Sequence, residues 1–191
     1  MKMQSKMLTF TNIVGSTFDR AAEQAMNLST VDAKSQPSSR MVLMKSFDEK
    51  GFVFNTNFNS KKGKNISNNN LVSLNFHWKS LRKQVRIEGK AIKISKSEAD
   101  NLFFDRPEGS KIGAWASKQS EVLIKRTELE ERVIKFEKKF RNKKILRPPN
   151  WSGYRVIPNL FEFWQDMPFR LHDRLEFKKV KNVWKIRKLY P

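Results

Sequence analysis

The amino-acid sequence predicts a mainly β protein with attached helices (α+β), in which antiparallel strands form a barrel. Short apolar or alternating segments follow one another with only turn signals between them, as in antiparallel sheets. Two or three helical segments interrupt these strands without the regular βαβ alternation of a parallel sheet. Neither a G-x-G-x-x-G nor a Walker A sequence occurs, which argues against a Rossmann or P-loop nucleotide site.

Strands are expected where apolar, β-branched and aromatic residues lie between turn signals. Asp48-Glu49-Lys50-Gly51 has the composition of a turn between two of them. Gly89 interrupts another, which predicts a bulge or a close approach of two backbones there. The expected strands cover residues 28–31, 39–47, 52–56, 71–78, 84–94, 154–157, 160–164, 175–179 and 183–189.

Periodicity and capping signals predict the helices. Apolar residues recur at helical spacing up to Ala25, so residues 1–26 are expected to form an N-terminal helical segment. Ser60 and the capping box that starts at Ser95 each begin a helix. Residues 121–141 combine dense charge with an apolar stripe, as an amphipathic surface helix does. The whole chain, 1–191, is expected to be one domain, with residues 27–191 forming the barrel and its inserted helices.

The charge balance first suggests a nucleic-acid partner. Of the 191 residues, 39 are Lys or Arg and 19 are Asp or Glu, which gives a formal net charge of +20. Clustered cations of this kind neutralise phosphates and release counterions. The 26 Lys residues are spread along the entire chain, however, so solvated surface lysines account for much of the excess equally well.

The scarcity of Cys and His excludes several chemistries. The chain has no Cys and only two His, so it has no disulfide framework, no thiolate nucleophile and no Cys/His zinc site. No metal site is expected. No apolar run reaches the length of a membrane span, and the N-terminus lacks the apolar core of a signal peptide. The sequence therefore predicts a cytoplasmic protein that does not contact a membrane.

Three segments place polar groups as an anion-binding site would. The segment from Arg40 to Lys45 is an apolar strand between two cations, where solvated charges are the alternative interpretation. Thr56 ends a strand just before the Ser60 cap and its adjacent lysines, and a helix start with hydroxyls and lysines can hold a phosphate. A capped helix with a basic first turn explains this second segment about as well.

The third segment lies near the C-terminus. Arg170, His172 and Arg174 alternate and would share one side of a strand. Such groups repel one another unless they face solvent or an anionic ligand. A lone basic strand face is usually solvated, but anion-binding signals in three separate segments favour a real site.

Taken together, the motifs resemble those of the pyridoxamine/pyridoxine 5′-phosphate oxidase family. The resemblance extends over residues 27–191, in the same order along the chain. Its residues are Arg40 to Lys45, Asn57-x-x-Ser60-Lys61-Lys62, Gln84-Val85, Arg106-Pro107, Ser110-x-Ile112-Gly113-Ala114-Trp115-x-Ser117-Lys118-Gln119-Ser120, Phe163-Trp164-Gln165 and Arg170-Leu171-His172-Asp173-Arg174.

The resemblance implies an FMN-binding split barrel that forms a homodimer, with FMN in clefts at the subunit interface. The implied reaction is oxidation of pyridoxamine or pyridoxine 5′-phosphate by O₂ to pyridoxal 5′-phosphate. Hydride would pass from C4′ to flavin N5, with release of H₂O₂ and, from the amine, ammonia. The implied FMN-binding residues are Arg40, Met41, Val42, Leu43, Met44, Lys45, Asn55, Thr56, Lys61, Lys62, Gln84, Gln119, Ser120, Trp164 and Arg174.

The resemblance also assigns the substrate site. Lys45, Arg106 and Ser110 would bind the substrate phosphate. Arg170 and His172 would lie over the pyridine ring as the catalytic residues, with Leu171 between them contacting the substrate.

Three positions depart from the family pattern. Asn55 stands where an aromatic residue is usual, Lys61 where Arg is usual, and Leu102 where a Tyr helps to bind the substrate phosphate. Two alternatives therefore stay open. One is an FMN split-barrel oxidoreductase that acts on another small substrate. The other is a basic nucleic-acid-binding barrel that uses lysines and aromatic residues.

Overall fold

Strand β6 (Trp151–Gln165) is the element around which the fold is arranged. One of its edges pairs with β5 (Lys83–Lys93) along almost its whole length. Its other edge pairs first with β3 (Gly51–Asn57), at residues 151–156, and then with β7 (Asp173–Val180), at residues 160–165. The pairing with β3 closes a barrel, and the pairing with β7 extends the sheet beyond it.

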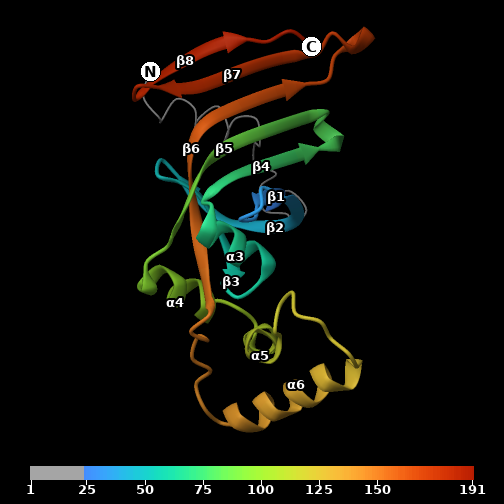
Figure 1. Ribbon diagram of the computed structural model, residues 1–191, viewed down its shortest axis with the longest axis vertical. Helices are drawn as coiled ribbons and strands as arrows, with labels where there is room; N and C mark the ends of the chain where they lie inside the picture. The colour runs from blue at the N-terminus through green and yellow to red at the C-terminus, as the bar shows by residue number, and fades with distance from the viewer. Residues whose placement is uncertain (1–23) are drawn as a thin grey trace.

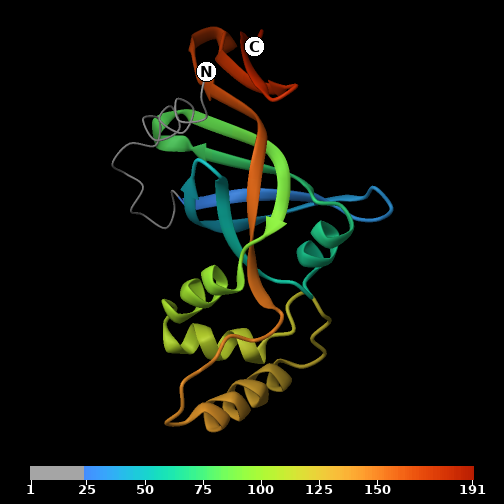
Figure 2. The ribbon, with the colours of Figure 1, turned by 90° about the vertical axis from the view of Figure 1, so that its left-hand side faces the viewer.

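The structure, a computed structural model, describes residues 24–191. Within this range all strands pair antiparallel in one sheet of order β3-β2-β1-β4-β5-β6-β7-β8, closed by β3–β6. The predicted antiparallel barrel with attached helices is confirmed (Figures 1 and 2). The remaining strands are β1 (Ala25–Val31), β2 (Pro37–Asp48), β4 (Leu71–Trp78) and β8 (Val183–Lys188).

The helices gather mainly at the end of the molecule where β6 begins. In Figure 1 the last three α-helices occupy the lower end, and β7 and β8 lie at the opposite end. None of the helices within residues 24–191 is both long and apolar enough to cross a membrane. The helices are α3 (Lys61–Asn68), α4 (Lys96–Phe104), α5 (Glu108–Ala116) and α6 (Arg126–Phe140), with short 3₁₀ turns η2 (Lys79–Leu81) and η3 (Pro168–Arg170).

Aromatic side chains fill the barrel. Phe52, Phe76 and Phe161 are fully buried, and the Phe52 ring lies 6.3 Å from the Phe76 ring and 6.0 Å from the Phe161 ring. Each buried phenylalanine contributes about 2–3 kcal/mol through the removal of apolar surface from water. A smaller core forms where α4 and α5 meet the start of β6, with Phe103 and Trp151 in edge-to-face contact at 5.1 Å.

Several local predictions are confirmed. Ser60 and Ser95 cap α3 and α4, and their side chains accept hydrogen bonds from the backbone N–H groups of residues 63 and 98. Gly89 lies at a register shift between β5 and β6. A Cβ at Gly89 would come within 2.3 Å of the Ile157 carbonyl oxygen, so the two backbones approach closely there.

Other local predictions were wrong. The expected strands 154–157 and 160–164 form one strand. Pro158 lies opposite the bulge at Gly89, where the hydrogen-bond ladder is already irregular, so the N–H that proline lacks does not interrupt the strand. Helix α6 begins at Arg126 rather than at residue 121. The sequence did not predict α5, whose small residues carry little helical signal.

Two further differences concern the chain ends. Arg170 and His172 do not share a strand face with Arg174, because Arg170 ends η3 with φ 62° and β7 starts only at Asp173. The helical segment expected before residue 24 lies outside the described residues. Strand β1 begins at Ala25, two residues before the expected start of the barrel.

Candidate active site

A cleft of about 500 Å³ opens beside β2, β3 and α5. It brings together seven of the predicted site residues that carry polar side chains. Among its described lining residues three are cations, Lys45, Lys62 and Arg106, and none is a carboxylate. This set predicts an anionic ligand, because nothing in the lining neutralises the three charges. The lining residues are Met41, Val42, Leu43, Lys45, Asn55, Thr56, Asn57, Lys62, Arg106, Ser110, Gly113, Ala114, Ser117, Gln119 and Trp151.

Strand β2 contributes four residues to the lining of this cleft, and three of them alternate along the strand. Met41, Leu43 and Lys45 point outward and are exposed, although two of them are large apolar residues. Met44 points the other way and is buried in the barrel core. Of the predicted ligand-binding strand, the side chain of Met44 is therefore turned away from the cleft.

Lys62 is held by the start of α3. Its Nζ donates to Oε1 of Gln119 over 2.8 Å and to Oγ of Ser60 over 3.4 Å. Burial, together with the nearby charge of Arg40, lowers the pKa of Lys62 from 10.5 to about 8. A bound anion would stabilise the charged ammonium form of Lys62 and so raise its pKa again.

Arg40 lies behind the cleft rather than on its wall. Its guanidinium donates to the carbonyl oxygens of Leu28 and Ser38 and to the hydroxyls of Thr30 and Ser38, over 2.7–3.1 Å. Burial lowers the pKa of Arg40. These four contacts fix Arg40 as a stationary positive charge beside Lys62.

Arg106 lies close to two aromatic rings. Its Cζ is 4.9 Å from the ring of Trp151 and 5.9 Å from that of Phe103, and burial lowers its pKa. Ser110 follows one turn later, in α5, where its backbone N–H donates to the Pro107 carbonyl. The cation–π contacts stabilise the charged guanidinium where it lines the cleft.

A second group of predicted residues lies in another cleft, of about 360 Å³, between the ends of β6, β7 and β8. Trp164, His172 and Arg174 line it, and it shares no lining residue with the cationic cleft. The rings of Trp164 and His172 are 4.6 Å apart. Arg170 and Leu171 lie in the connecting turn, and Leu171 is exposed.

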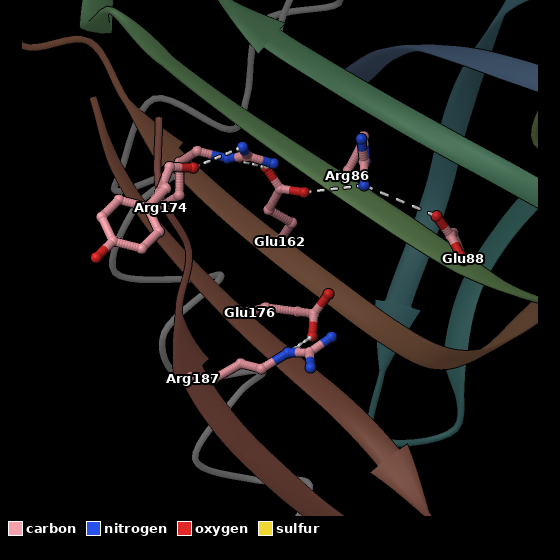
Figure 3. Close-up of polar contacts among 7 residues, drawn as sticks. Arg86, Glu88, Glu162, Arg174, Glu176 and Arg187 are labelled. Atoms are coloured by element: carbon pink, nitrogen blue, oxygen red, sulfur yellow. Dashed lines mark hydrogen bonds and ion pairs between the residues drawn. The ribbon is translucent and has the colours of Figure 1, made fainter. Parts of the chain in front are cut away.

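Arg174 is anchored by a buried carboxylate (Figure 3). Its Nε and Nη2 reach Oε1 of Glu162 over 2.9 and 2.8 Å, while Nη2 of Arg86 reaches Oε2 of Glu162 over 2.9 Å. Glu162 is only 3% exposed. The carboxylate thus fixes the guanidinium plane of Arg174 and offsets two positive charges.

The same face of the sheet carries a second buried carboxylate. Glu176 on β7 lies directly across from Glu162 on β6 and binds Nε of Arg187 on β8 over 2.5 Å. Arg86, Glu162, Glu176 and Arg187 occupy one row of paired positions across four strands. Each glutamate has an arginine beside it, so the two negative charges are balanced separately.

Of the remaining predicted residues, Asn55 lines the cationic cleft, and Lys61, Gln84 and Ser120 line neither cleft. Lys61 is exposed, and Gln84 pairs with Trp164 in the β5–β6 ladder. Ser120 adjoins Gln119 in a left-handed conformation, φ 74°, and lines a separate pocket. Asn55 faces the cationic cleft, and its buried Oδ1 has no hydrogen-bond partner among the described residues.

Sequence reasoning missed the carboxylates that hold the predicted residues. Glu162 left a signal, because it is a charged residue between Phe161 and Phe163 in an apolar strand. Asp166, which lies between Arg82 and His172, left none. Within residues 24–191 no group of three His, Cys, Asp or Glu side chains is arranged to hold a metal ion.

Comparison with protein families gives two matches. The sequence model described as "Pyridoxamine 5'-phosphate oxidase" matches residues 18–140. The model described as "Pyridoxine 5'-phosphate oxidase C-terminal dimerisation region" matches residues 151–191. Together these matches include both clefts.

Individual relatives agree with these matches. The pyridoxine/pyridoxamine 5′-phosphate oxidase of Acaryochloris marina is 50% identical over 167 residues, covering 87% of this chain and 76% of the relative. The protein of the same name from Caulobacter vibrioides (strain NA1000 / CB15N) is 51% identical over 167 residues, covering 87% and 75%.

Solved structures share the fold. The crystal structure of PhzG from Burkholderia lata in complex with tetrahydrophenazine-1-carboxylic acid has a TM-score of 0.87 at 29% identity, covering 99% of this chain and 91% of that chain. A pyridoxamine 5′-phosphate oxidase-related, FMN-binding protein from Nostoc punctiforme has a TM-score of 0.75 at 14% identity, covering 96% and 95%. The second likeness concerns the fold alone.

Proposed function

Because this chain belongs to the pyridoxamine 5′-phosphate oxidase family, we propose that it oxidises pyridoxamine or pyridoxine 5′-phosphate to pyridoxal 5′-phosphate. FMN is the proposed cofactor and O₂ the electron acceptor, with H₂O₂ and, from the amine, ammonia as the other products. Relatives that are 50–51% identical over 87% of this chain carry this oxidase name. The supporting observation in the structure is the cleft with three cations and no carboxylate.

The residues of this cleft fit FMN. A flavin phosphate needs cations and donors, and Lys62 with the hydroxyl of Thr56 supplies them beside the start of α3. The unpartnered Oδ1 of Asn55 supplies an acceptor for a ligand hydroxyl or ring N–H. When bound, the flavin supplies hydride acceptance and reoxidation by O₂.

The chain's own residues bind and orient the substrate in this proposal. Lys45, Arg106 and Ser110 hold its phosphate, and the contact with the Trp151 ring helps to position the Arg106 guanidinium. Arg170 and His172 contact the pyridine ring near the reacting carbon. Arg174, fixed by Glu162, contributes a positive charge toward the flavin.

A homodimer completes the site in this proposal. Most of the proposed ligand residues line one of two clefts that have no lining residue in common. All lining residues of the second cleft except Lys83 lie within the region whose family match is described as a dimerisation region. In Figure 1 β7 and β8, which border the second cleft, lie at the end opposite α5 and α6. We infer that the cationic cleft of one protomer faces the second cleft of its partner.

Anaerobic reduction tests the function. Purified protein loaded with FMN should lose its flavin absorbance near about 450 nm when pyridoxamine or pyridoxine 5′-phosphate is added without O₂, and regain it on exposure to air. In the Arg170→Ala variant the flavin absorbance should fall much more slowly, with the flavin content of the protein unchanged. A flavin that stays oxidised with both substrates would contradict the substrate assignment, and protein that does not retain FMN would contradict the cofactor assignment.

A second candidate function changes only the substrate. The likeness to PhzG, which was crystallised with tetrahydrophenazine-1-carboxylic acid, favours a reduced ring compound as the hydride donor. The identity of 29% to PhzG is well below the 50% to the pyridoxine/pyridoxamine oxidase of Acaryochloris marina. The same bleaching assay with the ring compound in place of the phosphate esters separates the two candidates.

A further inference from the structure

Asp166, in the turn after β6, lies between an arginine and a histidine. Its Oδ2 accepts from Nε and Nη2 of Arg82 over 2.8 and 2.7 Å, and its Oδ1 lies 3.1 Å from Nδ1 of His172. Its backbone N–H also donates to the carbonyl of Arg82 over 2.9 Å. Contacts from both backbone and side chain therefore clamp this carboxylate in one position.

His172 is held equally closely. Its ring lies 4.6 Å from that of Trp164, its side chain is 17% exposed, and it lines the second cleft. The turn that carries it contains two consecutive non-glycine residues in the left-handed region, Phe169 with φ 57° and Arg170 with φ 62°. Such backbone strain persists only where surrounding contacts fix the conformation, and it is common at binding sites.

Two groups compete for Nδ1 of His172. The backbone N–H of Met167 points at it over 3.2 Å and would require a bare nitrogen, whereas the carboxylate of Asp166 at 3.1 Å requires a proton there. Hydrogen bonds to Arg82 lower the pKa of Asp166, so the group is a full anion at neutral pH. A hydrogen bond from Nδ1–H to the charged carboxylate is stronger than one from the neutral Met167 amide to a bare Nδ1. The carboxylate therefore determines that Nδ1 carries the proton.

We propose that Asp166 is a positioning residue, which fixes the ring proton of His172 on Nδ1 and leaves Nε2 as a hydrogen-bond acceptor toward the substrate. The inference rests on the proposed function, because it takes His172 as a substrate contact. Nε2 would accept from the hydroxyl or amino group on the carbon that loses hydride. Arg82 supports this arrangement by holding Asp166 as an anion at the correct angle.

Nitrogen NMR of the histidine rings tests the proton position without any turnover. The chain has only two histidines, so His77→Gln leaves a single ring signal to assign. In protein labelled with ¹⁵N in its histidine rings, neutral His172 should show the Nδ1–H tautomer. In Asp166→Ala, Met167 becomes the sole partner of Nδ1, and the signal should change to the Nε2–H tautomer. An Nε2–H tautomer in the unchanged protein, or no change in Asp166→Ala, would overturn the proposal.

Turnover kinetics provide the second readout. Asp166→Ala should lower kcat at least about tenfold, with KM changed less than about threefold, since the lost interaction orients a reacting contact. Asp166→Asn keeps the side-chain shape and a neutral acceptor, so its kcat should lie between those of the unaltered protein and Asp166→Ala. This variant also keeps the proposal testable if the alanine variant does not fold. If kcat/KM fell by the same factor through a higher KM with kcat unchanged, a positioning role would be contradicted.

Asp48→Asn is the matched control. Asp48 is also a turn aspartate paired with an arginine, Arg155, over 2.6 Å, and it lines neither cleft. This variant should leave both the His172 tautomer and kcat unchanged. The two proposals fail separately: an oxidised flavin in the bleaching assay counts against the function, whereas an unaltered tautomer in Asp166→Ala counts against the role of Asp166.

Discussion

Nζ of Lys62 donates a hydrogen bond to Oε1 of Gln119 over 2.8 Å, which joins residues 57 positions apart across the cationic cleft. The bond connects the start of α3 with the segment that follows α5. Because Gln119 is neutral, it orients the ammonium without cancelling its charge. The cleft therefore keeps a positive group that an anionic ligand can use.

The pKa of Lys62 predicts a pH-dependent cofactor affinity. Burial lowers this pKa to about 8, so the unliganded protein loses the ammonium charge as pH rises above that value. A bound phosphate requires the charge, and the Kd for FMN should therefore rise above pH 8, by up to about tenfold per pH unit. Fluorescence titration with FMN from pH 7 to 10 measures this slope.

Two lysine variants sharpen that measurement. Lys62→Met should weaken FMN binding at pH 7 by about ten- to a hundredfold and abolish the slope. Lys64→Met, which alters an exposed lysine of the same helix, should preserve both affinity and slope.

The pKa of Lys62 also predicts how stability depends on pH in the protein without FMN. Between pH 8 and 10.5 the Lys62 side chain is protonated more fully in the unfolded chain than in the folded protein. The free energy of unfolding should therefore gain a contribution from Lys62 that increases with pH in this range.

Arg106→Lys should separate substrate binding from cofactor binding. Lysine keeps the charge but loses the planar donors and the guanidinium contact with the Trp151 ring, so KM for the phosphate substrate should rise about tenfold or more. Flavin content should stay the same. Steady-state kinetics together with the flavin-to-protein absorbance ratio measure both effects, and an unchanged KM would remove Arg106 from the phosphate site.

Glu162→Gln should weaken both stability and flavin binding. The substitution breaks a buried charge cluster that includes Arg86 and Arg174, at a cost of about 3 kcal/mol in the free energy of unfolding. Freed from its anchor, Arg174 should hold FMN less tightly, which a faster flavin release would report. Denaturant unfolding and stopped-flow fluorescence are the two measurements.

Glu176→Gln is the control for the preceding variant. Glu176 lies opposite Glu162 on the same sheet face but pairs with Arg187, which is largely exposed. Because Glu176 binds one largely exposed arginine and Glu162 binds two arginines, the loss of Glu176 should cost less in the free energy of unfolding than that of Glu162 and leave flavin release unchanged. Equal flavin release from both glutamate variants would mean that Glu162 acts on stability alone.

Mixed dimers test whether two protomers share each site. Arg106→Ala removes a proposed substrate contact from the cationic cleft, and Arg170→Ala removes one from the turn beside the second cleft, so either homodimer should be nearly inactive. If each site combines the two clefts from different protomers, a mixed dimer contains one intact site. Random mixing then yields about a quarter of the unaltered activity. No recovery after mixing and refolding would mean that both clefts of one protomer serve the same site.

The sequence by itself determined most strands, the capped starts of α3 and α4, the bulge at Gly89 and the identity of the cations. These features depend on neighbours a few residues away, through side-chain alternation, capping hydroxyls and glycine geometry. The residue types also indicated an anion-binding site, because lysines and hydroxyls at the start of a helix can hold a phosphate whatever the rest of the fold. Local patterns failed where a residue depended on a distant strand, as at Pro158.

Only the tertiary structure decided which groups face one another. It placed Lys62 in the cleft and left its neighbour Lys61 exposed, because α3 buries one face against the barrel. It also divided the proposed site between two clefts and paired Asp166 with Arg82, 84 positions away. The physical reason is that the pairing of β6 with β3, β5 and β7 fixes these contacts, and no periodicity within a single segment encodes the partners of a strand.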